Sequence, residues 1–219
     1  MGLIILALII AYLIGSIPNG LLVVWIFSGK DVRTIESGRT GGTNAMRAAG
    51  ITAGLITTVL DILKGAGVVW LARWIVPGNI WVEVAAAVLA VIGHNYSIYL
   101  IERNDKGNLR MRGGAGGTCA LGAAIGLWPL AGLFVAPLAI AAFVLIGYAS
   151  AATMTIGLAS LIVFAVRAVV GTGPWEYIVY GLMAVFLIVW ALRPNLKRIA
   201  NGTERAVGLR AARQKKVTN

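Results

Sequence analysis

The amino-acid sequence predicts an all-α, polytopic integral membrane protein, and three observations support this class. First, 59% of the 219 residues are hydrophobic and only 12% are charged, whereas soluble domains carry about 25% charged residues. Second, long apolar runs recur along the chain, and a helix of roughly 20 such residues spans a bilayer. Third, most of the cationic residues gather between these runs.

Six apolar runs account for most of the chain. Five are candidate transmembrane helices: 3–27, 51–76, 79–101, 151–170 and 175–192. The first run lacks a basic leading segment and a clear cleavage site, so we interpret it as a retained helix and not a signal peptide. The sixth run, 119–147, contains Pro129 and Pro137. Its Gly122 and Gly126 have the spacing that allows close packing of membrane helices.

The distribution of charge predicts the topology. Sixteen of the nineteen Lys and Arg residues lie in the segments 28–50 and 102–117 and in the tail from residue 193. Cytoplasmic loops collect Lys and Arg, so all three segments should be cytoplasmic. This requires 119–147 to cross as two short helices with a turn near Trp128 and Pro129. The sequence therefore predicts seven transmembrane helices, an external N-terminus and a cytoplasmic C-terminus.

The composition also limits the classes of partner and cofactor. The net charge of +11 is accounted for by this topology, so we expect no nucleic-acid partner. Cys119 is the single cysteine, which excludes an intramolecular disulfide, and His94 is the single histidine. We expect no metal site from one histidine and the few carboxylates present. We place a membrane domain at 1–204 and a basic, flexible cytoplasmic tail, which meets lipid headgroups, at 205–219.

The first cytoplasmic loop resembles a phosphate cradle. Residues 37–47 read Ser-Gly-Arg-Thr-Gly-Gly-Thr-Asn-Ala-Met-Arg. The glycines permit tight turns and close approach of backbone N–H groups to an anion, and hydroxyl, amide and Arg47 side chains add donors. The loop then enters a helix, whose N-terminus favours anions. An ordinary glycine-rich connection between helices explains the pattern equally well.

Ionisable groups also occur inside the apolar runs. Asp61 and Lys64 lie three residues apart, on one face of a helix. Charges within a membrane span face the bundle interior or a wet cavity and often mark function, although a structural ion pair is the alternative. His94 is a candidate general base, phosphate donor or buried core histidine.

Two further cytoplasmic segments suit anions. Residues 112–118 form a second glycine-rich stretch at a helix start, for which a flexible connector is the alternative. Residues 193–204 follow the last apolar run and contain Asn195 and Arg198. From spacing alone, a helix end with a basic patch at the membrane surface is the favoured explanation of this segment, because such patches are common.

The order of these motifs is more specific than any single motif. It runs Gly15-Ser16-Ile17-Pro18-Asn19-Gly20, Asp31-Val32-Arg33, Ser37-Gly38, Gly41-Gly42-Thr43-Asn44, Arg47, Leu60-Asp61-Ile62-Leu63-Lys64-Gly65, Gly93-His94, Gly113-Gly114, Gly116, Asn195, Arg198, Gly202 and Glu204. This series resembles the bacterial acyl-phosphate–glycerol-3-phosphate acyltransferase family from about residue 10 to 205. The resemblance implies a seven-helix enzyme of the bacterial inner membrane that works without a metal, coenzyme A or other cofactor. Its substrates would be acyl phosphate and glycerol 3-phosphate, and its products lysophosphatidic acid and phosphate.

The resemblance also implies roles for individual residues. Catalytic roles are expected for Ser37, Asn44 and His94. Acyl phosphate would be held by Ser37, Gly41, Gly42, Thr43, Asn44, Arg47 and Lys64. Glycerol 3-phosphate would be held by Gly113, Gly114, Gly116, Asn195 and Arg198. Because acyl phosphate is already activated, hydrogen bonds and positioning are expected to suffice, without a covalent intermediate.

Three positions depart from the family pattern. Arg39 stands where the family has asparagine, Ala115 where it has lysine, and Leu192 where it has histidine. In the family, the lysine and histidine at these positions are the groups expected to bind the acceptor phosphate. In this chain, Arg39, Arg112 or Arg193 could replace their charge. The alternative is a relative with another acceptor, or a non-catalytic binder of acyl phosphate. A transporter of phosphorylated solutes ranks last, because the polar motifs cluster on one face.

Overall fold

The computed structural model describes residues 1–103 and 107–211 and is built almost entirely of helices. The α-helices are α1 (Gly2–Ser16), α2 (Asn19–Ser28), α3 (Gly42–Ile75), α4 (Ile80–Asn95), α5 (Gly117–Leu127), α6 (Ala131–Leu145), α7 (Ala149–Val169) and α8 (Glu176–Ala200). Short 3₁₀ turns occur at Val32–Thr34 and Ile98–Leu100. Strands β1 (Ile101–Arg103) and β2 (Leu109–Met111) form a small antiparallel hairpin in which Ile101 faces Met111.

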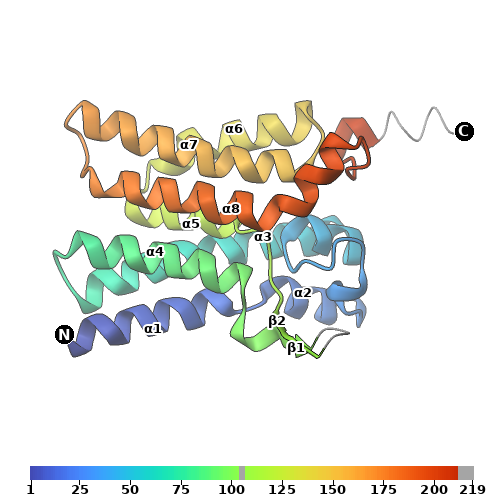
Figure 1. The fold of residues 1–219 in the computed structure, drawn as a ribbon, viewed down its shortest axis with the longest axis horizontal. Helices are drawn as coiled ribbons and strands as arrows, with labels where there is room; N and C mark the ends of the chain where they lie inside the picture. Colours follow the sequence, from blue (N-terminus) through green and yellow to red (C-terminus); the bar gives the residue numbers. More distant parts are fainter. Residues whose placement is uncertain (104–106, 212–219) are drawn as a thin grey trace, which may run out of the picture.

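The long helices lie side by side along the longest axis of the molecule, with the N-terminus at one end and the last described residues, up to 211, at the other (Figure 1). Within the described residues, five segments are long and apolar enough to cross a membrane: Gly2–Ser28, Gly42–Ile75, Ile80–Leu100, Ala149–Val169 and Glu176–Ala200. The shorter apolar helices α5 and α6 come from the 119–147 run, which turns at residues 128–130. The protein is therefore an all-α integral membrane protein.

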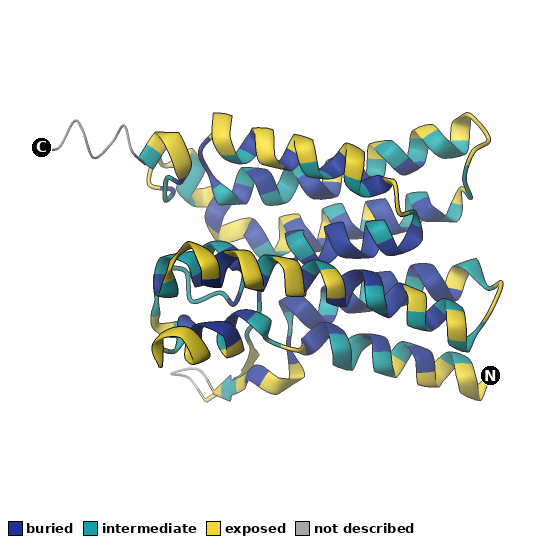
Figure 2. Cartoon of the chain, turned by 180° about the vertical axis from the view of Figure 1, so that it is seen from behind, coloured by how far each residue is buried: buried dark blue, intermediate teal, exposed yellow. Residues whose placement is uncertain are grey.

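Burial follows the pattern expected in lipid. Large apolar side chains such as Trp25, Leu133 and Phe186 are exposed, and the outward sides of the helices carry most of the exposed residues (Figure 2). The interior instead uses small residues, because close approach of helices is what stabilises packing in a membrane. A Cβ added to Gly122 would lie 2.0 Å from the Ile62 carbonyl oxygen on α3. The predicted close packing through Gly122 and Gly126 is thus confirmed.

Three element boundaries differ from the sequence expectation, and local chemistry explains two of them. The first run breaks between α1 and α2 at Pro18, which lacks an N–H and restricts the residue before it. The last helix continues to Ala200 through Pro194, instead of ending at residue 192. Pro194 leaves the Trp190 carbonyl without its helical donor, and Arg193 Nε donates to that carbonyl at 3.0 Å.

The third difference concerns α3, which begins at Gly42 and not at residue 51. Its regular geometry is interrupted at Ala49 and Gly50, so the segment before the break is a separate helical piece. This piece buries Ala45 and Ala48 in a small cluster with Val24 and Val32, apart from the main core.

The start of the predicted tail packs against the helices. Ala206 forms an isolated bridge with Tyr148, and Val207 is buried and donates its N–H to the Gly147 carbonyl at 2.9 Å. Arg205 pairs with Glu36. The remainder of the tail prediction, at 212–219, lies outside the described residues. The chain around Glu36, the hairpin, and the end of α8 all lie at the same end of the molecule (Figure 1).

Candidate active site

A cavity of about 120 Å³ lies at this end of the bundle, where three helices begin. Its walls include the first residues of α3 (Gly42–Asn44), α5 (Gly117 and Thr118) and α7 (Ala149 and Ser150). The first N–H groups of a helix have no partner within the helix, and the helix dipole adds positive potential there. Three helix N-termini at one cavity therefore make a strong binding site for an anion.

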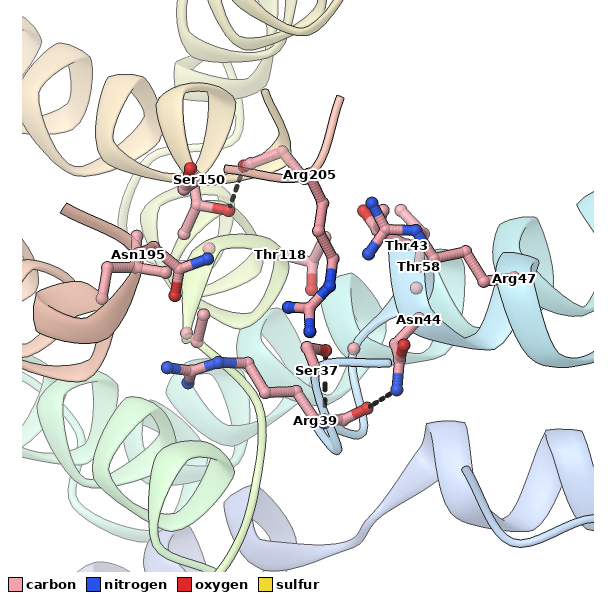
Figure 3. Close-up of a pocket in the computed structure, with 18 of the residues that line it drawn as sticks. Ser37, Arg39, Thr43, Asn44, Arg47, Thr58, Thr118, Ser150, Asn195 and Arg205 are labelled. Atoms are coloured by element: carbon pink, nitrogen blue, oxygen red, sulfur yellow. Dashed lines mark hydrogen bonds between the residues drawn. The ribbon is translucent and has the colours of Figure 1, made fainter. Parts of the chain in front are cut away.

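The first glycine-rich loop is shaped by Asn44. The Nδ2 group of Asn44 donates to the carbonyl oxygens of Val32, Ile35 and Arg39 at 3.0, 3.0 and 2.9 Å. These bonds fold the loop back over the start of α3 and bring Ser37 to the cavity, where Figure 3 shows it beside Arg205. The Asn44 amide group therefore holds the first loop in its folded conformation.

Asp61 is the centre of a buried polar cluster behind the cavity, and it is 1% exposed. Its carboxylate lies 3.1 Å from Lys64 Nζ and accepts bonds from Asn19 Nδ2 at 3.1 Å and Thr118 Oγ1 at 3.4 Å. His94 Nδ1 lies 3.6 Å from it. Thr118 and His94 line the cavity, whereas Lys64 is not among its lining residues and also donates to the Ile17 carbonyl. Lys64 was expected to contact acyl phosphate directly. In the structure it contacts Asp61 and the Ile17 carbonyl and does not line the cavity.

The second glycine-rich loop packs directly on His94. The Gly114 N–H donates to the His94 carbonyl at 2.8 Å, and a Cβ on Gly114 would lie 1.9 Å from His94 Nε2. A residue larger than glycine could not take this path. The loop is also tied to the first loop, since the Thr40 N–H donates to the Gly113 carbonyl at 3.4 Å.

The end of α8 contributes a network around Glu204. Glu204 Oε1 accepts from Asn195 Nδ2 at 2.8 Å and from Ser150 Oγ at 3.2 Å, and Oε2 accepts from Arg198 Nε at 2.9 Å. Because the NH₂ group of Asn195 must face the carboxylate, its Oδ1 faces elsewhere. That buried oxygen accepts no hydrogen bond within the described residues. A buried acceptor of this kind is costly until a donor, such as a ligand hydroxyl, reaches it.

A second, open cavity of about 920 Å³ adjoins the first. Its lining is rich in cations, namely Arg33, Arg39, Arg110, Arg112, Arg193, Lys197, Arg198 and Arg205. Four residues line both cavities: Ser37, Arg39, Asn195 and Arg205. The polar end of the bundle therefore offers two adjoining anion sites, one at the helix N-termini and one under a cationic surface.

The structure brings nearly all of the sequence-predicted site residues to these two cavities. The smaller one is lined by Ser37, Gly41, Gly42, Thr43, Asn44, Arg47, His94, Gly116 and Asn195, and the larger one by Ser37, Gly113, Gly114, Asn195 and Arg198. The lining residues Thr58, Ser150, Thr153 and Arg205 were not predicted from the sequence, and Thr118 and Glu204 were given no individual role within the predicted anion segments. The local sequence does not single out Thr153, because Ser and Thr also occur in apolar helices with their hydroxyls bonded to the preceding turn, as Thr153 Oγ1 is to the Ala149 carbonyl at 2.9 Å.

Comparison with known proteins identifies the family to which the chain belongs. Residues 5–202 match the family model described as glycerol-3-phosphate acyltransferase. A glycerol-3-phosphate acyltransferase of Thermus thermophilus is 39% identical over 93% of this chain and 95% of its own length. The enzyme of Listeria monocytogenes is 36% identical over 91% and 94%.

Two crystal structures of PlsY (YgiH), an integral membrane glycerol 3-phosphate acyltransferase, are also similar. The glycerol 3-phosphate form has a TM-score of 0.79 at 29% identity and covers 94% of this chain and 96% of its own. The lysophosphatidic acid form has a TM-score of 0.76. The motif order, the helical membrane fold and the two adjoining anion sites thus have one common explanation: this chain belongs to the glycerol-3-phosphate acyltransferase family and is a membrane acyltransferase.

Proposed function

We propose that this enzyme transfers an acyl chain from acyl phosphate to the sn-1 hydroxyl of glycerol 3-phosphate. The observation that carries the proposal is the pair of anion sites that meet at Ser37, Arg39, Asn195 and Arg205. A reaction between two phosphorylated substrates needs two such sites within reach of each other, since positioning supplies much of the catalysis when the donor is already activated.

Acyl phosphate binds with its phosphate at the N-termini of α3, α5 and α7. Backbone N–H groups of Gly42 and Thr43 and the side chain of Arg47 hold it there. Ser37 and neighbouring donors stabilise the carbonyl oxygen as it gains negative charge. Lys64 acts through Asp61, which orients Thr118 and His94 at the cavity wall.

Glycerol 3-phosphate binds in the larger cavity, with Gly113 and Gly114 on one side and Asn195 and Arg198 on the other. Its hydroxyl oxygen attacks the acyl carbon, a new C–O bond forms, and the bond from the acyl carbon to the phosphate oxygen breaks. The hydroxyl proton passes to an oxygen of the leaving phosphate, so no protein base is needed. Asn195 Oδ1, which lacks a donor in the described residues, accepts from a glycerol hydroxyl.

We further propose that α5 and α6 each cross the bilayer, which gives seven crossings in the bacterial inner membrane. The N-terminus is then external, and the active face and C-terminus are cytoplasmic. The clustering of cationic residues at the site end of the bundle supports this orientation. A single chain lines both cavities, so a monomer embedded in membrane lipid is sufficient for activity.

The test is incubation of the purified protein with palmitoyl phosphate and glycerol 3-phosphate. We expect phosphate release that depends on the acceptor, together with lysophosphatidic acid. The matched control is the same protein with palmitoyl phosphate and glycerol, which lacks the acceptor phosphate. Absence of acceptor-dependent product at high protein concentration would reject the proposal.

One observation favours a second candidate, a relative that uses another acceptor. Ala115 and Leu192, which line the smaller cavity, bring no charge to it. A panel of phosphorylated and neutral polyols in the same assay separates the two candidates. The second is favoured only if another acceptor has a higher kcat/KM than glycerol 3-phosphate.

A further inference from the structure

Arg39 lies where the two cavities meet and lines both of them. Its side chain extends from the first loop toward the side of the site where Asn195 lies (Figure 3). Nη1 donates to the Gly114 carbonyl at 2.9 Å, and Nη2 donates to the Ala191 carbonyl. The guanidinium is therefore held beside Ala115 and Leu192, the residues that follow those two carbonyls in the chain.

Most neighbouring cations already have partners, whereas Arg39 has no ion pair within the described residues. The engaged cations are Arg112 with Glu102, Arg198 with Glu204, Arg205 with Glu36, and Arg193, whose guanidinium lies 3.3 Å from the centre of the Trp190 ring. Arg47, Arg110 and Lys197 also lack an ion pair within the described residues. Arg47 lies on the α3 side of the cavity, away from Asn195 (Figure 3), and Arg110 and Lys197 line only the larger cavity and not its junction with the smaller one.

The surroundings of Arg39 favour an anion as its missing partner. Burial lowers the pKa of Arg39, and the nearby charge of Arg198 lowers it further. Arginine nevertheless keeps its charge in proteins, and a half-buried cation without a counter-ion loses part of its hydration without compensation. The two carbonyls use only part of the guanidinium, whose other N–H groups donate to no protein atom in the described part of the chain.

We propose that Arg39 binds the phosphate of the acceptor and thereby sets the affinity for glycerol 3-phosphate without setting that for the acyl donor. This inference rests on the proposed function. The two carbonyls orient the planar guanidinium so that its remaining N–H groups meet phosphate oxygens in the larger cavity. A planar group with parallel N–H donors suits phosphate well. One arginine from the first loop thus supplies the charge that positions 115 and 192 lack.

A purely structural role for Arg39 is the competing explanation, because the same two hydrogen bonds tie the first loop to the second loop and to α8. The two roles differ in what a relocated charge can do. A lysine at position 115 would bring a cation to the same junction, but it could not rebuild the bonds that link the loop to the Gly114 and Ala191 carbonyls. Rescue by relocation therefore indicates a role of the charge itself.

The experiment compares wild type, Arg39→Gln, the double variant Arg39→Gln/Ala115→Lys, and the control Arg103→Gln. Arg103 carries the same charge, is exposed on the hairpin and lines neither cavity. For each protein, KM for both substrates, the melting temperature in detergent, and calorimetric binding of glycerol 3-phosphate without donor are measured. We expect Arg39→Gln to raise KM for glycerol 3-phosphate roughly 10- to 100-fold, the loss typical of one charge-assisted contact.

In Arg39→Gln, the KM for palmitoyl phosphate should stay within about threefold of the wild-type value, because the proposal gives Arg39 no contact with the donor. The double variant should recover most of the acceptor KM, and Arg103→Gln should match wild type. An unchanged acceptor KM in a folded Arg39→Gln overturns the inference. So does an equal rise in both KM values, or a raised acceptor KM in Arg39→Gln that Ala115→Lys does not lower.

Failure of the proposed function is distinguishable from failure of this inference. If wild type makes no lysophosphatidic acid, the proposed reaction is wrong. Calorimetry still tests Arg39 in that case: binding of glycerol 3-phosphate that is lost in Arg39→Gln supports the inference, and equal binding in both proteins overturns it.

Discussion

Two adjacent glycines at the start of α3 have different physical reasons to lack a side chain. A Cβ on Gly42 would lie 2.2 Å from Thr58 Oγ1 and 2.9 Å from the Gly54 carbonyl oxygen, so Gly42 is required by packing. A Cβ on Gly41 would meet no protein atom within 4 Å, although Gly41 lines the smaller cavity. The space beside Gly41 is therefore available to a ligand.

Gly41→Ala and Gly42→Ala form a matched pair of variants. We expect Gly41→Ala to keep the wild-type melting temperature and to lose about 10- to 100-fold in kcat/KM, because its methyl group displaces acyl phosphate from the backbone N–H groups. Gly42→Ala should lower the free energy of unfolding by about 1–3 kcal/mol through overpacking. Thermal unfolding in detergent and the acyl-transfer assay measure both effects. Wild-type activity in Gly41→Ala would show that the ligand binds elsewhere.

At the scale of elements, the break within α3 sets the direction of the helix N-terminus that faces the cavity. Gly50 has φ +90° and ψ 173°, a region of backbone space that is essentially restricted to glycine. The break allows the first piece of α3 to pack on Val24 and Val32 while the rest of the helix runs through the main core. A continuous helix could not satisfy both clusters.

Gly50→Ala tests this account, with Gly67→Ala in the same helix as its control. Gly67 has regular helical geometry, and a Cβ there would meet nothing within 4 Å. We expect Gly50→Ala to destabilise the fold by about 1–3 kcal/mol and to lower activity, because the strained backbone shifts the cavity wall. Gly67→Ala should stay within about 0.5 kcal/mol of wild type. Equal behaviour of the two variants in thermal unfolding would contradict a special role for the break.

At the scale of the whole molecule, the candidate site lies at one end of the helix bundle and not in its centre. Residues 29–41, 96–103 and 107–116, the end of α8 and the starts of three helices gather at one end, and the N-terminus lies at the other (Figure 1). The proposed acceptor is a polar solute and the proposed donor carries a fatty chain, so a site at a membrane face can receive both. The orientation of the bundle therefore decides which compartment supplies the acceptor.

The proposed orientation predicts opposite accessibility for Thr172 and Thr203, which are both exposed. Thr172 follows α7 and Thr203 follows α8. In a Cys119→Ala background, a membrane-impermeant maleimide applied to intact spheroplasts should label Thr172→Cys and spare Thr203→Cys. Both should be labelled after the membrane is permeabilised, which controls for reactivity. The reverse pattern would place the active face outside.

Features that depend on neighbouring residues and on composition could be predicted without the structure. Apolar runs and low charge determined an all-α membrane protein, and glycine-rich helix starts with Asn44 and Arg47 indicated anion loops. The helix break at Pro18 was not predicted. The continuation of α8 through Pro194 was not predicted either, because it depends on the hydrogen bond from Arg193 to the Trp190 carbonyl.

Which of these polar groups lie together depends on contacts between segments that are distant in the chain. The start of α7 and Arg205 are far from residues 37–47 in the chain, yet they line the same cavity. Lys64 pairs with Asp61 and is not among the residues that line the smaller cavity. Arg39 is the clearest case. The orientation of its guanidinium depends on the carbonyls of Gly114 and Ala191, which only folding brings beside it. Local patterns encode what a segment can bind, whereas long-range packing decides which segments share a ligand.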